Sequence, residues 1–176
     1  MSNPLDPIWD AYSTAMDALT VVRQCVSLPT ATPSDLFKDT RFQSRPSEDT
    51  LGSLAKAQAQ LGDQTVLSLF AAFEARIRDH VAEKCAALST AGLSDPPFWQ
   101  AISKSLQKYC DQPGSSENLT DLFRSRADPA TLDSLASIRQ YRNWVAHGRR
   151  PPAKTSVVPF HAYDALTSFL KAAKAV

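Results

Sequence analysis

Glycine and proline mark out long helical stretches along this chain. The five Gly and twelve Pro fall almost entirely at breaks between stretches rich in Ala, Leu, Gln, Lys and Glu. Those residue types favour helices, and no run of alternating Val, Ile and Thr has the period of a strand. The sequence therefore predicts an all-α helical bundle. Its 176 residues are expected to form one domain, because we find neither an internal repeat nor a second set of core-forming segments.

A helix is predicted in each stretch between breaks. Asp95-Pro96 and Asp128-Pro129 each supply a capping carboxylate followed by Pro at the first helical position. Ser47 is the expected cap of another helix, and Gly62-Asp63 either breaks or bends the chain fifteen positions later. A Pro-rich loop, with at most one helical turn, is expected over 29–46. The predicted helices cover about 7–28, 47–61, 64–88, 96–109, 117–124 and 129–147, and a last helix begins at 159 or 160 and ends at 175.

The helix over 64–88 has the pattern of a buried core helix. Val66, Phe70, Phe73 and Ile77 recur at spacings of three and four, which places them on one face. Further apolar residues broaden that face, namely Leu67, Leu69 and Val81. This helix is predicted to form the centre of the core.

Composition excludes several classes of protein. No apolar run approaches the roughly 18 residues of a membrane span, and the first residues lack a signal-peptide pattern, so we expect a cytoplasmic protein. Three widely spaced cysteines, Cys25, Cys85 and Cys110, predict ordinary thiols, not a disulfide framework, a zinc site or a catalytic thiol. No metal or cofactor is expected.

Positive charge is concentrated in one segment. Residues 124–154 contain seven basic and two acidic residues, although the whole chain carries a net charge of only +1. This asymmetry favours an anionic partner that docks on the segment. The alternative is a set of solvated helix-end residues that interact with the helix dipole.

The helix over 129–147 carries a polar arc near its C-terminal end. At about 100° per residue, Arg139, Arg142, Asn143 and His147 span about 140° of one face, which we expect to line a cleft. An imidazole can act as base or acid near neutral pH, and a guanidinium fork suits phosphate oxygens. Asn143 stands one turn from His147 and could orient its ring. The same residues could instead interact only with free carbonyls at the helix end.

Arg142-Asn143-Trp144-Val145-Ala146-His147 resembles the signature of the HEPN superfamily, in which Arg, a polar residue and His follow in this order. A second stretch, Leu69 to Arg78 with its Phe73-Glu74 pair, resembles the preceding core helix of small HEPN nucleases. The resemblance covers about 63–150. It leaves residues 1–47, with the N-terminal helix and the Pro-rich loop, unrecognised.

The resemblance implies a homodimeric, metal-independent endoribonuclease that cleaves RNA by attack of its 2′-hydroxyl, as toxins or anti-phage defence effectors do. Arg142, Asn143 and His147 would be catalytic in a composite site. Glu74 and Arg139 would support them, although Glu74 could equally pair with Arg78. Arg149, Arg150 and Lys154 would bind RNA, and an antitoxin or defence-system protein would be a further partner. His80 and His161 match nothing in the signature and are expected to be structural or surface residues.

Two other functions fit the same residues. One is a non-catalytic RNA-binding or nucleotide-binding helical protein that uses the same basic cluster. The other is a protein-interaction module without nuclease activity. Cleavage that depends on His147 distinguishes the nuclease from both.

Overall fold

The computed structural model describes residues 2–28, 37–90, 95–110, 116–149 and 156–176. Within these ranges the chain forms six α-helices and a short 3-10 helix, without any strand. The prediction of an all-α bundle is confirmed. The helices are α1 (Asp6–Ser27), α3 (Ser47–Thr90), α4 (Pro96–Cys110), α5 (Ser116–Asp121), α6 (Pro129–Ala146) and α7 (Pro159–Ala173).

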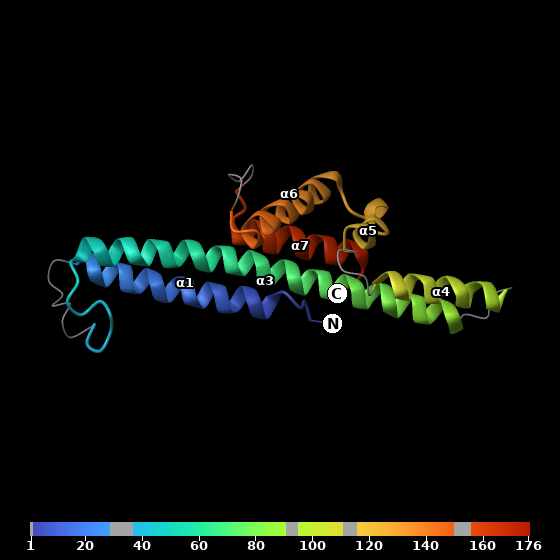
Figure 1. Ribbon diagram of the computed structural model, residues 1–176, viewed down its shortest axis with the longest axis horizontal. Helices are drawn as coiled ribbons and strands as arrows, with labels where there is room; N and C mark the ends of the chain where they lie inside the picture. The colour runs from blue at the N-terminus through green and yellow to red at the C-terminus, as the bar shows by residue number, and fades with distance from the viewer. Residues whose placement is uncertain (1, 29–36, 91–94, 111–115, 150–155) are drawn as a thin grey trace.

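The long helix α3 is the axis of the molecule. Its 44 residues correspond to about 66 Å at 1.5 Å per residue. Figure 1 shows α1 along its first half, α4 along its last part, and α6 with α7 across its middle. Gly62-Asp63 does not break α3, so that alternative of the prediction is wrong. A helical Gly costs about 1 kcal/mol relative to Ala, and the packing of α3 against its neighbours outweighs that cost.

The main core lies where α3 meets α6 and α7. Val66, Phe70, Phe73 and Ile77 are each 1% exposed, which confirms the predicted face of the central helix. The ring centroids of Phe73 and Phe169 of α7 lie 5.5 Å apart in an edge-on arrangement. The N-terminus also joins this core, since Leu5 is fully buried.

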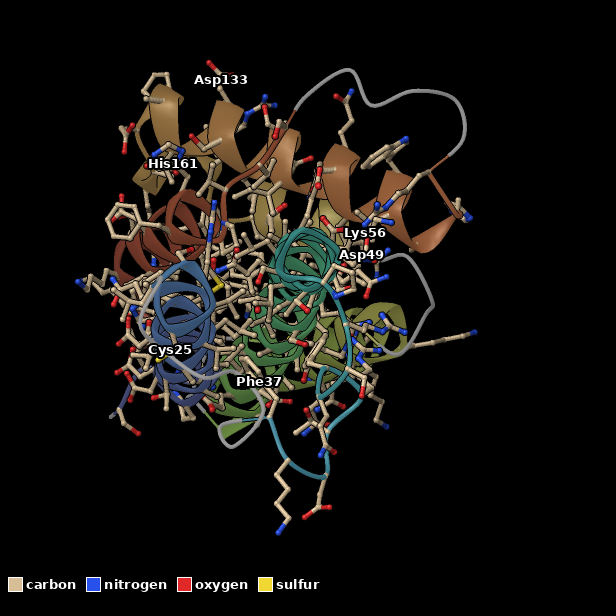
Figure 2. The ribbon with its side chains drawn as sticks, turned by 90° about the vertical axis from the view of Figure 1, so that its left-hand side faces the viewer. Cys25, Phe37, Asp49, Lys56, Asp133 and His161 are labelled. Atoms are coloured by element: carbon tan, nitrogen blue, oxygen red, sulfur yellow. The ribbon has the colours of Figure 1, made fainter. Side chains whose placement is uncertain are left out.

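A smaller apolar cluster closes the far end of the α1–α3 pair. Val26 near the end of α1, Phe37 and Leu54 of α3 are its buried members. Phe37 lies beside these two helices, away from α6 (Figure 2). This cluster gives the segment that resembled no known family a packing role, because it holds the ends of α1 and α3 together.

The two Asp-Pro capping signals are confirmed. Asp128 Oδ1 accepts a hydrogen bond from Thr131 N (2.9 Å), and Asp95 Oδ1 accepts one from Phe98 N (3.3 Å). The prediction for Ser47 is wrong, because α3 begins at Ser47 itself and Pro46 O accepts the first helical bond.

The helix predicted over 117–124 is shorter than expected. Its α-helical part, α5, ends at Asp121, and a 3-10 helix follows over Arg124–Arg126. Leu119 and Phe123 are buried here, so tertiary packing sets this segment more than helix propensity does. No helix in the described part of the chain is long and apolar enough to cross a membrane.

Candidate functional site

The proposed motif occupies the last turns of α6, and Gly148 ends that helix as predicted. His147 is the C-cap, and Gly148 adopts a left-handed φ of 74°. Gly148 N donates to Val145 O (3.1 Å) and Arg149 N donates to Trp144 O (2.8 Å). These two bonds form a Schellman motif, which satisfies carbonyls that would otherwise lack partners. The backbone around His147 is therefore fixed on both sides.

Arg142 points from α6 towards α3. Its Nη2 lies 3.4 Å from Glu74 Oε2, and its guanidinium carbon lies 5.5 Å from the centre of the Phe70 ring. The side chain of Arg142 is 36% exposed, so this ion pair is only partly shielded from water. The two stretches that carry the family resemblance thus meet through Arg142 and Glu74. Glu74 therefore pairs with Arg142 of α6. The alternative expectation was a pair with Arg78 on its own helix.

Asn143 and His147 are both exposed, and Asn143 has a hydrogen-bond partner on its own helix. Asn143 Oδ1 accepts a hydrogen bond from Arg142 Nη1 (2.9 Å), so the amide is held by the neighbouring cation. This arrangement differs from the expected orientation of the imidazole by Asn143. The His147 side chain is exposed on the same turn. It is accessible to a ligand from solvent.

Arg139 faces another neighbour, and the polar arc is therefore divided. Its Nη2 donates to Thr120 Oγ1 of α5 (3.2 Å). The long side chain of Arg139 thus contacts α5, and that of Arg142 contacts α3. Asn143 and His147 have shorter side chains and face solvent. Arg139 therefore lies apart from the other three residues of the arc. The candidate site narrows to Arg142, Asn143, His147 and Glu74.

Asp63 on α3 anchors the chain just beyond His147. Its Oδ1 accepts a hydrogen bond from Tyr141 Oη (2.6 Å), and its Oδ2 pairs with Arg149. Arg149 also lies over the ring of Trp144, 5.7 Å from its centre. Burial raises the pKa of Tyr141, so its hydroxyl remains a hydrogen-bond donor at neutral pH.

Arg149 is therefore bound to a carboxylate in this structure, and Arg150 and Lys154 lie outside the described residues. Asp63 and Tyr141 are parts of the site that the sequence did not predict. The sequence marked Asp63 only as part of a break or bend at Gly62-Asp63, and its partner Tyr141 lies 78 positions further on, so no local pattern joins the two.

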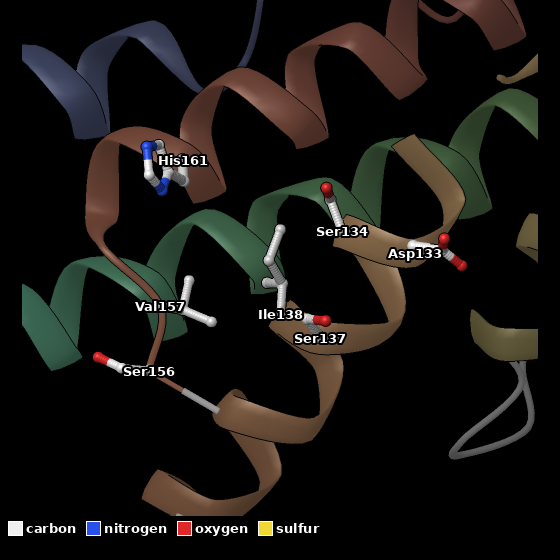
Figure 3. A pocket seen from close by; sticks show the side chains of 7 residues that line it. All are labelled: Asp133, Ser134, Ser137, Ile138, Ser156, Val157 and His161. Atoms are coloured by element: carbon white, nitrogen blue, oxygen red, sulfur yellow. The ribbon is translucent and has the colours of Figure 1, made fainter. Parts of the chain in front are cut away.

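The other two imidazoles lie elsewhere. His80 is 3% exposed and packs 5.7 Å from the Phe123 ring, and burial lowers its pKa. His161 is exposed at the start of α7 and lines a hollow of about 290 Å³ between α6 and α7 (Figure 3). No residue of the polar arc lines that hollow.

The chemistry that this site could support is acid–base chemistry on a phosphate ester. It combines a guanidinium, an amide and an accessible imidazole on one helix end. The described residues contain no group of three or more His, Cys, Asp or Glu placed to hold a metal ion. No protein-family model matches the sequence, and neither curated proteins nor solved structures give a match.

Proposed function

We propose that the protein is a HEPN-type, metal-independent endoribonuclease in which Arg142, Asn143 and His147 are catalytic. The contact between Arg142 and Glu74 supports this proposal most directly. This contact joins the two separate stretches that resemble the family. His147, at the same end of α6, is exposed and so accessible to RNA. By the same resemblance, the biological role would be that of a toxin or an anti-phage defence effector.

Cleavage would proceed through the 2′-hydroxyl of the RNA. A base removes its proton, the oxygen attacks the neighbouring phosphorus, and an acid protonates the departing 5′-oxygen. His147 would serve as base or acid. Arg142 would stabilise the negative charge on the phosphorane oxygens, and Asn143 would hold the guanidinium in place. The products would be a 2′,3′-cyclic phosphate and a 5′-hydroxyl.

A phosphate must compete with Glu74 for Arg142. The ion pair is long at 3.4 Å and partly exposed, so it contributes little and can be exchanged for a bidentate contact to phosphate. Arg142→Lys should lose most activity although the charge is kept, because a point charge cannot form that fork.

The decisive experiment is incubation of purified protein with labelled tRNA and mRNA in EDTA. His147→Ala should abolish cleavage, whereas His161→Ala, which removes the other exposed imidazole, should leave the rate near wild type. End analysis should find cyclic phosphate and 5′-hydroxyl ends. Loss of activity in EDTA with rescue by Mg²⁺, or 5′-phosphate ends, would refute the mechanism.

We also propose that the site is shared across a homodimer. Each chain offers one imidazole in the motif, while the reaction is best served by two acid or base groups. Subunits of wild type and His147→Ala should be mixed by unfolding and refolding at varied ratios. Activity should fall as the square of the wild-type fraction. A linear plot, with mixed dimers shown to be present, contradicts the shared site.

A specific observation favours a second function, non-catalytic binding of RNA or a nucleotide. Arg142, which cleavage needs beside the phosphorane oxygens, already has Glu74 as a carboxylate partner, while Asn143 and His147 stay exposed to a ligand. This arrangement weakens charge stabilisation in the reaction more than it weakens contact with a bound nucleotide. A protein of this kind would bind RNA with a salt-dependent affinity that His147→Ala leaves unchanged. It would cleave none of the RNAs tested. The same assays therefore separate the two functions.

A further inference from the structure

Four aromatic rings gather at the surface where α1 meets α7. Trp9 is at the centre of this aromatic patch, which consists of Trp9, Tyr12, Phe160 and Tyr163. The ring centre of Trp9 lies 5.0 Å from that of Tyr163 in a stacked pair, 5.4 Å from that of Tyr12 and 5.8 Å from that of Phe160. None of the four rings is fully buried, and Phe160 is 54% exposed.

Phe160 adds exposed apolar surface to the patch. A Phe ring buries a large apolar area, and Val158, at the N-cap of α7, is also 52% exposed. Trp and Tyr are enriched at the centres of protein interfaces, because their rings offer contact area at a low cost in side-chain entropy. The patch therefore has the composition of an interface centre.

The charge around the patch is negative. Residues 2–22 and 156–170 contain four Asp and no Lys or Arg. Asp6 accepts a hydrogen bond from Tyr163 Oη (2.8 Å) and so lies directly beside the rings. Asp10 follows Trp9, Asp164 follows Tyr163, and both are exposed. A nucleic-acid backbone would be repelled here, since it needs positive charge.

We infer that the aromatic patch is a docking surface for a partner protein that presents arginine side chains. A guanidinium stacks on aromatic faces and pairs with carboxylates through its planar fork, and the patch offers both groups. Lysine fits less well, because its ammonium is a compact and strongly hydrated charge. The inference is independent of the nuclease proposal, and activity is not a readout in its test.

The probe is a synthetic peptide with four arginines separated by glycine and serine, beside its four-lysine counterpart and a single-stranded RNA. Binding is followed by the indole N–H resonance of Trp9 in two-dimensional NMR, with Trp99 and Trp144 as internal references. The arginine peptide should shift the Trp9 resonance and bind about threefold more tightly than the lysine peptide, as expected for a stacked guanidinium.

Two pairs of variants locate the binding. Phe160→Ala removes an exposed ring, and Asp10→Asn removes a rim carboxylate, so neither should disturb folding. Each should weaken the arginine peptide at least about threefold. The matched controls are Val21→Ala, an exposed apolar residue near the other end of α1, and Asp49→Asn, a carboxylate far from α7 (Figure 2). Both should bind like wild type.

Several results overturn the inference. Equal affinity for both peptides, together with equal weakening by Asp49→Asn, would indicate general attraction to negative charge. A Trp9 shift caused by RNA but not by the arginine peptide would make this a nucleic-acid surface. Dissociation of a dimer by Phe160→Ala, seen in sedimentation, would show that a second copy of the chain covers the patch. An unchanged Trp9 resonance would exclude binding there.

Discussion

Replacing Asp63 by Ala should destabilise the protein by about 2 kcal/mol, although the substitution lies inside a helix that prefers Ala. Asp63 is 13% exposed in its side chain and accepts a bond from Tyr141 Oη (2.6 Å), worth about 1.5–3 kcal/mol for a charged acceptor. The pair with Arg149 adds about 0.5 kcal/mol, because the Arg149 side chain is 47% exposed. Ala has a higher helix propensity than Asp, and this offsets about 0.5 kcal/mol of the loss.

Urea unfolding at neutral pH measures this effect. With a slope of about 2 kcal/mol per molar urea for a chain of this size, the midpoint should fall by about 1 M. Asp79→Ala is the matched control, since Asp79 is an exposed carboxylate on the same helix. Its unfolding free energy should stay within about 0.5 kcal/mol of wild type.

A double-mutant cycle attributes the loss to the contact itself. Tyr141→Phe removes only the hydroxyl that donates to Asp63. If the contact anchors the end of α6, the coupling energy between Asp63→Ala and Tyr141→Phe should be about 1 kcal/mol or more. A coupling near zero, or a loss no larger than that of Asp79→Ala, would refute the reasoning that Asp63 holds α6 to α3.

Three further outcomes are expected. Burial lowers the pKa of His80 below its ordinary value of 6.5, with Lys84 and Arg76 adding to the effect. The imidazole of His80 therefore binds a proton more readily in the unfolded chain, so the unfolding free energy should fall as the pH drops below about 6.5. In the His80→Phe variant, the unfolding free energy should depend less on pH in this range. Gly148→Ala should cost about 1 kcal/mol in urea unfolding, because its φ of 74° strains any side chain although the space is open. Phe73→Ala should cost about 3–5 kcal/mol by the same measurement, since the ring is 1% exposed, and a loss below about 1 kcal/mol would contradict its place in the core.

The sequence by itself determined the all-α class, the two ends of α6 and the central apolar face. Local signals act over a few residues, and they were strong here: Asp128-Pro129 starts α6, Gly148 ends it, and the spacing from Val66 to Ile77 marks the buried side of α3. Each signal is a property of the neighbouring backbone or of one helix face, so it can be read without knowledge of distant residues.

Only the tertiary structure decided which side chains meet. Local propensity allowed a break at Gly62-Asp63, but packing against its neighbours keeps α3 a single helix. In that helix Asp63 bonds to Tyr141 and pairs with Arg149. The polar arc looked continuous on a helix drawn alone, yet Arg142 reaches Glu74 and Arg139 reaches Thr120. Such pairs join residues far apart in the chain, and the geometry between helices, which no local pattern encodes, determines them.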